Sequence, residues 1–412
     1  MYTATQRTCR IVVIAVLLMA SRLHAASAED QYKVAATHYS HGQWQSAADE
    51  FKVFLDQFPH DARRSAAMFF LGETLVQLQR YDDATRQFSD LLASSPQDRN
   101  ASQASFRIAE IAFFQGKYKE ARQRLSELKF AAADDPRNAH VLAYLGEIAL
   151  AQSDGAAAEG FYRKAIEKFG QGPLESECRF GMARSLELQG QTDEAIRFYQ
   201  FLVDNHRGTL IDDAQLQIGV LKYRKGAVQE AIVALESFKA AFPESELRAD
   251  AGYWHGVSLL ALHKNAEAAA VLRDAADAAD QTSRSDLAPA IRFSWSDALR
   301  KSGDESSANA QCQMLLDKWP DSPWGDDACQ ALADAALRAG QFDRAEELGR
   351  LFAAKYGGSS LRPYISQTLG RVLLKRERYA EAASVFQALL ADGAKSPDGG
   401  ANDEKAAAAR AA

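Results

Sequence analysis

The sequence predicts an all-α fold, a solenoid of about ten helix-turn-helix units with a period of 37 residues. The first observation is a ladder of ten alanines, spaced by 37, 37, 37, 37, 36, 37, 40, 37 and 37 residues. The second is that small and large apolar residues repeat in register with them. The third is that no segment alternates with a period of two, so no sheet is expected. The ladder is Ala47, Ala84, Ala121, Ala158, Ala195, Ala231, Ala268, Ala308, Ala345 and Ala382.

Each unit is expected to hold two antiparallel amphipathic helices. We number positions from the ladder alanine: position −12 is small, position −13 is nearly always large and apolar, and positions +4 and +7 are mostly large and apolar. Spacings of three and four residues place +4 and +7 beside the alanine on one helix face. Glycine at position −5 predicts the turn, because a left-handed residue can end the first helix. These glycines are Gly42, Gly116, Gly190, Gly226, Gly303 and Gly340, and Pro59, Pro96, Pro243 and Pro320 are expected to end the second helix.

This order of small residue, alanine, aromatic residue and proline resembles the tetratricopeptide repeat, from Asp30 to about Leu390. The resemblance implies a right-handed superhelical solenoid. The family repeat has 34 residues, so the three extra residues are expected to lengthen the helices. Segments such as Phe70-Leu71-Gly72-Glu73 and Tyr253-Trp254-His255-Gly256 are similar to two periplasmic groups. These are the Tol-Pal-associated cell-division coordinator and the D lipoprotein of the outer-membrane beta-barrel assembly machine.

The chain is expected to divide into a signal peptide (1–28), a repeat array (29–390) and a disordered low-complexity tail (391–412). Arg7 and Arg10 precede a short apolar run, and small residues before Glu29 offer a cleavage site. The ten-residue run is too short to span a bilayer, so no transmembrane segment is expected after cleavage. The mature protein is expected in the periplasm, or secreted or surface-associated if the host has no outer membrane.

Charge and motifs argue against several function classes. The formal net charge is −7 and becomes −10 when the three arginines of the leader are removed. An acidic chain without a basic stripe is a poor ligand for nucleic acid or for an anionic membrane. No phosphate loop, nucleophile elbow or metal-binding signature occurs, so we expect no catalytic, cofactor-binding or metal-binding residues and no enzyme. His255 interrupts an apolar column and is expected to be a hydrogen-bonded core residue.

Two cysteines permit a disulfide. Cys312 lies in the second helix of unit eight and Cys329 in the first helix of unit nine, nearly equidistant from the connecting turn. An antiparallel helix pair would bring them close, and an oxidising periplasm would allow the bond. The alternative is that both are small core residues.

Three columns of the first helices are candidates for a partner-binding groove, since the resemblance implies that first helices line the inner face. Positions −15 and −11 carry aromatic and acidic residues toward the N-terminus, and position −7 is basic toward the C-terminus. The columns comprise Tyr32, Phe69, Phe106 and Tyr253, then Glu73, Glu110 and Glu147, then Arg224, Lys301, Arg338 and Lys375. The first half would hold a segment with basic groups and the second an acidic segment. The alternative is that the aromatics form interhelix core and the cations complement helix dipoles.

The resemblance implies a noncatalytic scaffold of the bacterial cell envelope that binds other envelope proteins or their extended segments during outer-membrane or peptidoglycan assembly. An adaptor of a secretion or exopolysaccharide export system is an alternative. An accessory of a glycan-acting enzyme is a weaker one, because every long stretch of the chain is occupied by repeats. The sequence does not indicate the oligomeric state.

Overall fold

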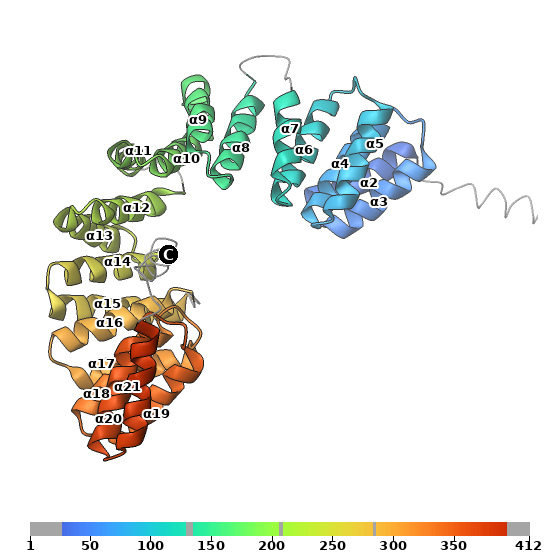
Figure 1. Cartoon of the computed structure of the whole chain (residues 1–412). Helices are drawn as coiled ribbons and strands as arrows, with labels where there is room; N and C mark the ends of the chain where they lie inside the picture. The colour runs from blue at the N-terminus through green and yellow to red at the C-terminus, as the bar shows by residue number, and fades with distance from the viewer. Residues whose placement is uncertain (1–26, 129–134, 206–208, 283–285, 394–412) are drawn as a thin grey trace, which may run out of the picture. The chain divides into compact units, whose positions relative to one another are not determined.

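The computed structural model describes residues 27–128, 135–205, 209–282 and 286–393 (Figure 1). In these ranges every regular element is a helix, and no strand occurs. The chain forms two compact units, Met1–Gln189 and Gly190–Ala412. The boundary lies inside the fifth repeat, at the turn between its two helices. The all-α repeat fold predicted from the sequence is confirmed, and a single continuous superhelix remains a prediction.

The first unit contains four helix pairs and the first helix of the fifth repeat. Consecutive helices pack against each other along the chain. Their bounds are α2 (Ala28–Ser40), α3 (Trp44–Gln57), α4 (Arg64–Gln77), α5 (Tyr81–Ser94), α6 (Ala101–Phe114), α7 (Tyr118–Glu127), α8 (Arg137–Ala151), α9 (Gly155–Phe169) and α10 (Glu175–Leu188).

The second unit begins with the second helix of the fifth repeat and adds five pairs. Its helices are α11 (Thr192–Asp204), α12 (Ile211–Arg224), α13 (Val228–Ala241), α14 (Arg248–Ala261), α15 (Asn265–Gln281), α16 (Ala288–Lys301), α17 (Glu305–Lys318), α18 (Gly325–Arg338), α19 (Phe342–Lys355), α20 (Arg362–Lys375) and α21 (Tyr379–Gly393). The 40-residue spacing is absorbed by α15, which has 17 residues where α13, α14 and α16 have 14. The three extra residues of this repeat therefore lengthen a helix, α15, which packs on α16.

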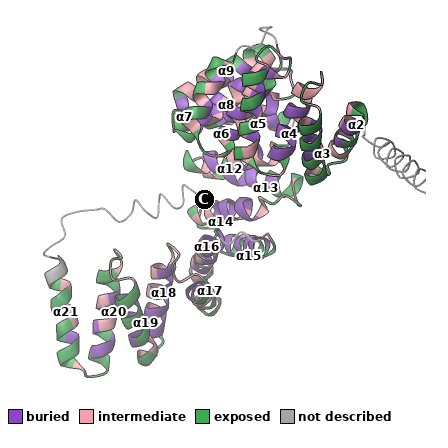
Figure 2. Ribbon diagram, turned by 90° about the vertical axis from the view of Figure 1, so that its right-hand side faces the viewer, coloured by how far each residue is buried: buried purple, intermediate pink, exposed green. Residues whose placement is uncertain are grey.

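The two helices of a repeat meet where a small residue at position −12 receives the large residue at position +4. A Cβ atom added to Gly72 would lie 2.4 Å from the ring of Phe88, and one added to Gly370 would lie 2.3 Å from the ring of Phe386. Gly146 has the same relationship to Tyr162. The alanine ladder is buried throughout, and buried residues alternate with exposed ones along the helices (Figure 2). This close packing explains why the small residue and the alanine recur together.

The ten intra-repeat turns share one backbone conformation. The six glycines predicted at position −5 all have positive φ, between 69° and 96°. The other four repeats place Gln79, Ser153, His263 and Glu377 at the same position, with φ between 57° and 60°. The turn geometry is therefore kept even where the sequence offers no glycine.

The outer segments of the domain prediction lie largely outside the described residues. Residues 1–26, most of the predicted signal peptide, are among these, as are 394–412 of the predicted tail. Helix α2 already begins at Ala28, and the Ser27 hydroxyl caps it by accepting from the backbone N–H of Asp30 at 3.1 Å. At the other end α21 reaches Gly393, and the division between array and tail stays a prediction.

The disulfide that the sequence permits is not formed in this structure, where Cys312 and Cys329 are both free thiols. Each faces the other helix of its own repeat. The Cys312 thiol donates to the Ser296 hydroxyl at 3.3 Å, and the Cys329 thiol donates to the carbonyl oxygen of Leu348 at 3.4 Å. Burial raises the pKa of Cys329 to about 12, so its thiol stays protonated. Both cysteines are small core residues, which was the alternative interpretation.

Candidate functional site

The aromatic column at position −15 is largely part of the helix packing. Tyr253 is only 4% exposed, and Tyr32, Phe69 and Phe106 are half-buried. The ring of Tyr32 packs edge-on against Phe54 at 5.4 Å between centroids. Such contacts hold the first helix against its neighbours and leave only part of each ring accessible.

The acidic column at position −11 is neutralised inside the first unit. Arg107 of α6 donates from Nε and Nη2 to the two carboxylate oxygens of Glu73 in α4, each at 2.8 Å. Its Nη1 atom donates to Glu110 at 2.5 Å. The Tyr144 hydroxyl in α8 donates to the other oxygen of Glu110, also at 2.5 Å. The chain of contacts therefore links the first helices of three consecutive repeats.

The electrostatics of this network follow from its burial. Burial raises the pKa of Glu73, and the guanidinium of Arg107 opposes that rise. The two carboxylates hold the pKa of Arg107 above its usual value despite burial. Burial and the neighbouring Glu110 raise the pKa of Tyr144, so its hydroxyl remains a donor. The network is a brace between helices, with its charges satisfied within the chain.

Position −11 makes polar contacts in other repeats as well. Glu147 accepts from the Tyr162 hydroxyl of its own repeat at 2.6 Å and pairs with Arg184, at position −11 of the next repeat, at 3.2 Å. In the second unit the Thr368 hydroxyl donates to Asp334 at 2.6 Å. Glu73 to Arg107, Glu110 to Tyr144 and Asp334 to Thr368 all join position −11 of one repeat to position −14 of the next. Sequence reasoning missed this pairing, although the 34-residue separation is readable in the sequence.

Position −7, at the C-terminal end of each first helix, is exposed in all ten repeats. In the first unit the column is uncharged, and Phe114 and Leu188 are 57% and 52% exposed. In the second unit four of the five residues are cations. The ten are Ser40, Gln77, Phe114, Ala151, Leu188, Arg224, Ala261, Lys301, Arg338 and Lys375. This column is the most accessible of the three predicted from the sequence.

The four cations differ in how they are held. Arg224 lies over the Trp254 ring at 5.5 Å from its centroid. Lys301 pairs with Asp297 at 2.8 Å, and Arg338 approaches Glu305 at 3.5 Å. No hydrogen bond or ion pair is found for Lys375 among the described residues. Exposed pairs of this kind contribute little to folding, so these cations can exchange their partners for a ligand.

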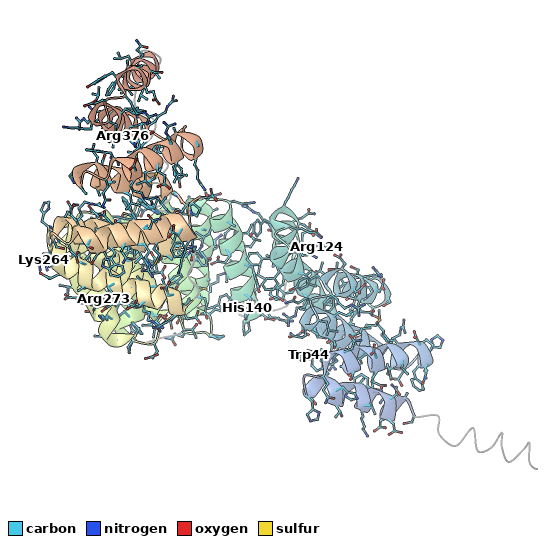
Figure 3. The ribbon with its side chains drawn as sticks, turned by 90° about the horizontal axis from the view of Figure 1, so that it is seen from below. Trp44, Arg124, His140, Lys264, Arg273 and Arg376 are labelled. Atoms are coloured by element: carbon cyan, nitrogen blue, oxygen red, sulfur yellow. The ribbon has the colours of Figure 1, made fainter. Side chains whose placement is uncertain are left out.

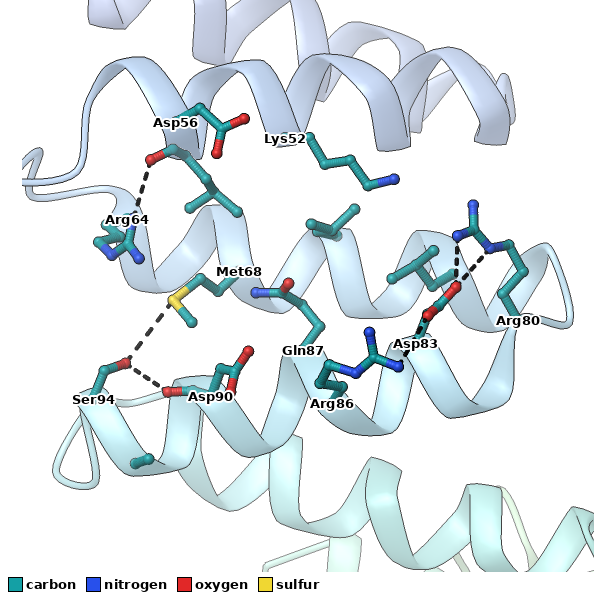
Figure 4. Close-up of a pocket in the computed structure, with 14 residues that line it drawn as sticks. Lys52, Asp56, Arg64, Met68, Arg80, Asp83, Arg86, Gln87, Asp90 and Ser94 are labelled. Carbon is teal, nitrogen blue, oxygen red and sulfur yellow. Dashed lines mark hydrogen bonds and ion pairs between the residues drawn. The ribbon is translucent and has the colours of Figure 1, made fainter.

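A groove of about 750 Å³ lies between α3, α4 and α5, on the side of the second helices (Figure 4). Its rim charges are paired locally, since Asp83 binds Arg80 at 2.5 Å and approaches Arg86 at 3.6 Å. Arg64 donates to the carbonyl oxygen of Leu55 at 3.1 Å. None of the residues predicted for the partner groove lines it.

A smaller cavity of about 360 Å³ lies between α13, α14 and α15 and includes His255. His255 is buried, as predicted, but the expected hydrogen bond is not found among the described residues. Its Nε2 atom has no hydrogen-bond partner and lies 3.8 Å from the carboxylate of Glu236. Burial lowers the pKa of His255, which keeps the ring neutral.

Comparisons with known proteins agree with the repeat geometry. Residues 8–180 match the tetratricopeptide repeat-like domain, and residues 177–209, 213–245 and 331–398 match tetratricopeptide repeats. The chain therefore contains tetratricopeptide repeats. No curated protein matches it.

Two solved structures are similar to this chain in fold. The C-terminal part of a repeat-containing protein from Cytophaga hutchinsonii is 14% identical, with a TM-score of 0.50. The match covers 63% of this chain and 98% of that one. The apo form of RapI is 10% identical, with a TM-score of 0.54 and coverage of 80% and 97%. At these identities the likeness concerns the fold alone.

Tetratricopeptide repeat proteins are typically noncatalytic scaffolds for protein–protein interaction. Across the described ranges of this one, no group of three or more His, Cys, Asp or Glu side chains is placed to hold a metal ion. A membrane-spanning helix would need greater length and apolarity than any helix described here has.

Proposed function

We propose that this protein is a noncatalytic interaction scaffold of the bacterial cell envelope, which binds extended segments of other envelope proteins along its first helices. Outer-membrane or peptidoglycan assembly is the process we propose, on the pattern of the two periplasmic groups that its repeats resemble. The leader-like residues 1–28 support a periplasmic location.

The observation that carries the proposal is the exposed column at position −7. This column presents one accessible side chain in each repeat, and in the second unit four of these are Arg224, Lys301, Arg338 and Lys375. A row of cations at repeat spacing favours a partner segment that carries carboxylates. The partner of the second unit is therefore an acidic segment.

The first unit offers a different surface. Glu73 and Glu110 are engaged by Arg107 and Tyr144, so they are poorly placed to select basic groups of a partner. The exposed rings and aliphatic groups of Phe114 and Leu188 remain accessible. We infer that this unit contributes apolar contacts, together with the accessible parts of Tyr32, Phe69 and Phe106.

The experiment is a crosslinking pulldown from intact cells with the wild type and a Lys301→Glu, Arg338→Glu, Lys375→Glu variant. A matched control, Arg273→Glu, Lys318→Glu, Lys355→Glu, makes the same charge change on exposed cations of second helices. Circular dichroism checks that both variants fold. We expect the captured envelope proteins to be lost only with the first variant.

Equal capture by both variants would show that the −7 column is not part of the binding surface. Capture of polysaccharide-export components in place of assembly proteins would assign the scaffold to that pathway. Localisation is tested separately by fractionation and by N-terminal sequencing of the mature chain, which is expected to begin at Glu29.

A further inference from the structure

Repeat ten exposes large apolar residues, and two of them stand at positions that are half-buried in repeat nine. Leu374, at position −8, is 45% exposed, whereas Leu337 at the same position of repeat nine is half-buried. Tyr379, at position −3, is 64% exposed, whereas Phe342 is half-buried. Leu390, at position +8, is 74% exposed. Figure 2 shows the broad exposed faces of α20 and α21.

Interior repeats show what covers position −8. The ring of Tyr39 packs on Phe70 of the next repeat, with centroids 5.1 Å apart. Phe113 packs on Tyr144 at 5.0 Å, and Tyr223 packs on Trp254 at 5.5 Å. In each case position −8 receives an aromatic side chain at position −14 of the following first helix. Leu374 has the same place in its repeat without a following helix in the described part of the chain.

The charge at this end also differs from that of the two preceding repeats. Position −11 is acidic in repeats two, three, four, eight and nine, whereas repeat five carries Arg184, which pairs with Glu147, and repeat ten carries Arg371. Neither Arg371 nor Lys375 has a hydrogen bond or ion pair among the described residues. By contrast, Arg376 (Figure 3) pairs with Asp343 at 2.5 Å and with Glu346 at 2.9 Å. The face of α20 therefore presents two cations beside exposed apolar groups.

We propose that this surface, the open end, docks an amphipathic helix of a partner protein that presents an aromatic side chain to Leu374 and carboxylates to Arg371 and Lys375. The open end consists of Tyr364, Arg371, Leu374, Lys375, Tyr379 and Leu390. Spacings of seven and three residues place Tyr364, Arg371 and Leu374 on one face of α20. The site is separate from the −7 column of the other repeats and does not depend on the proposed groove function.

Charge disfavours the two occupants that the chain itself could supply. Head-to-tail stacking of a second copy would bring position −14 of repeat one, Lys33, against Arg371. Continuing the 37-residue register into the chain's own C-terminal residues would place Lys405 there. Like charges in contact oppose both arrangements, whereas an acidic helix satisfies the two cations and covers the apolar groups.

The test uses lactam-stapled helical peptides and the full chain, with binding followed by fluorescence anisotropy. The first peptide carries a tyrosine and glutamates on one face. A second replaces the glutamates with lysines, and a third replaces the tyrosine with alanine. The protein variants are Leu374→Glu and Arg371→Glu, with Val233→Glu as the control because Val233 is 55% exposed on α13, away from the open end.

We expect the acidic tyrosine peptide to bind, and the other two peptides to bind at least about tenfold more weakly. Both open-end variants should lose about tenfold in affinity while Val233→Glu matches the wild type, and added salt should weaken binding. Equal binding of the lysine peptide, or no loss in Leu374→Glu, would overturn the proposal.

Two further outcomes would assign the surface to the chain itself. Dimerisation of the wild type in sedimentation, abolished by Leu374→Glu, would make a second copy the occupant. A tenfold gain in peptide affinity after deletion of residues 394–412 would make the C-terminal residues the occupant. Either result overturns the partner helix, and unchanged affinity with a monomeric wild type supports it.

Discussion

Arg107 in α6 reaches back 34 residues to Glu73 in α4 and binds both of its carboxylate oxygens at 2.8 Å. The side chain of Glu73 is 10% exposed and that of Arg107 is 36% exposed. The pair joins the first helices of repeats two and three at a place where both repeats also share apolar core. The acidic column that suggested a binding groove is thereby part of what holds successive repeats together.

Removing Arg107 should destabilise the first unit. Arg107→Ala leaves the Glu73 carboxylate buried without its cation, which we expect to cost about 2–4 kcal/mol. The double variant Glu73→Gln, Arg107→Met removes both charges and should recover more than half of that loss. Thermal unfolding and hydrogen exchange of α4 and α6 measure the loss of stability in the single variant and its recovery in the double variant. An unchanged free energy of unfolding in Arg107→Ala would mean that this network contributes no stability.

The turn at Gln79 should be improved by glycine. Gln79 has φ of 57°, a conformation that costs an L-residue about 1 kcal/mol, so Gln79→Gly should stabilise the chain by up to that amount. Gly116→Ala is the matched reverse change, because Gly116 has φ of 71° and no atom within 4 Å of an added Cβ. It should destabilise by about 1 kcal/mol through backbone strain alone. We expect the two variants to change the free energy of unfolding, measured by urea denaturation, in opposite directions.

The contact between Gly72 and Phe88 should be sensitive to a single methyl group. Gly72→Ala forces Phe88 to move, because the added Cβ would lie 2.4 Å from the ring, and should cost about 1–3 kcal/mol. Adding Phe88→Leu recreates the pair that repeat three uses, Ala109 with Leu125, and should restore part of the stability.

The control for this prediction is another helical glycine. Gly160→Ala in α9 adds a methyl group with no atom within 4 Å and should stabilise the helix by about 0.5–1 kcal/mol. If Gly72→Ala were also stabilising, the packing at position −12 would be looser than described.

Low pH should destabilise the connecting segments that precede α4 and α8. Asp61 binds Arg63 through side-chain and backbone N–H groups, and these contacts lower the pKa of Asp61 to about 2. The same contacts of Arg137 lower the pKa of Asp135 to about 2. A lowered pKa in the folded state means that the stabilisation is present above the unfolded value, near 3.8, and is lost as pH falls toward 2.

The expected result is a loss of unfolding free energy between about pH 4 and about pH 2 that is smaller in an Asp61→Asn, Asp135→Asn variant than in the wild type. Urea midpoints measured across this range provide the comparison. Identical slopes for the two proteins would show that these aspartates do not titrate as described.

Sequence periodicity was sufficient to predict the helix pairs, because the contact of position −12 with position +4 requires a small residue at position −12 in every repeat. The six turn glycines followed from the same reasoning. The four other turn residues could not be predicted, because Gln79 and His263 adopt a left-handed backbone only when the flanking helices impose it. The sequence also left open whether Cys312 and Cys329 are bonded, because equal distance from a turn does not fix which way their side chains point.

The sequence by itself determined the repeat class, the helix order and the turn positions, because these follow from local spacing and residue size. Only the tertiary structure decided which columns are accessible. Whether Glu73 is a ligand for a partner or for Arg107 depends on how neighbouring helices are offset, and whether Leu374 is core or surface depends on what packs next to it. The exposure of a side chain depends on its neighbours in space, and local sequence spacing does not define those neighbours.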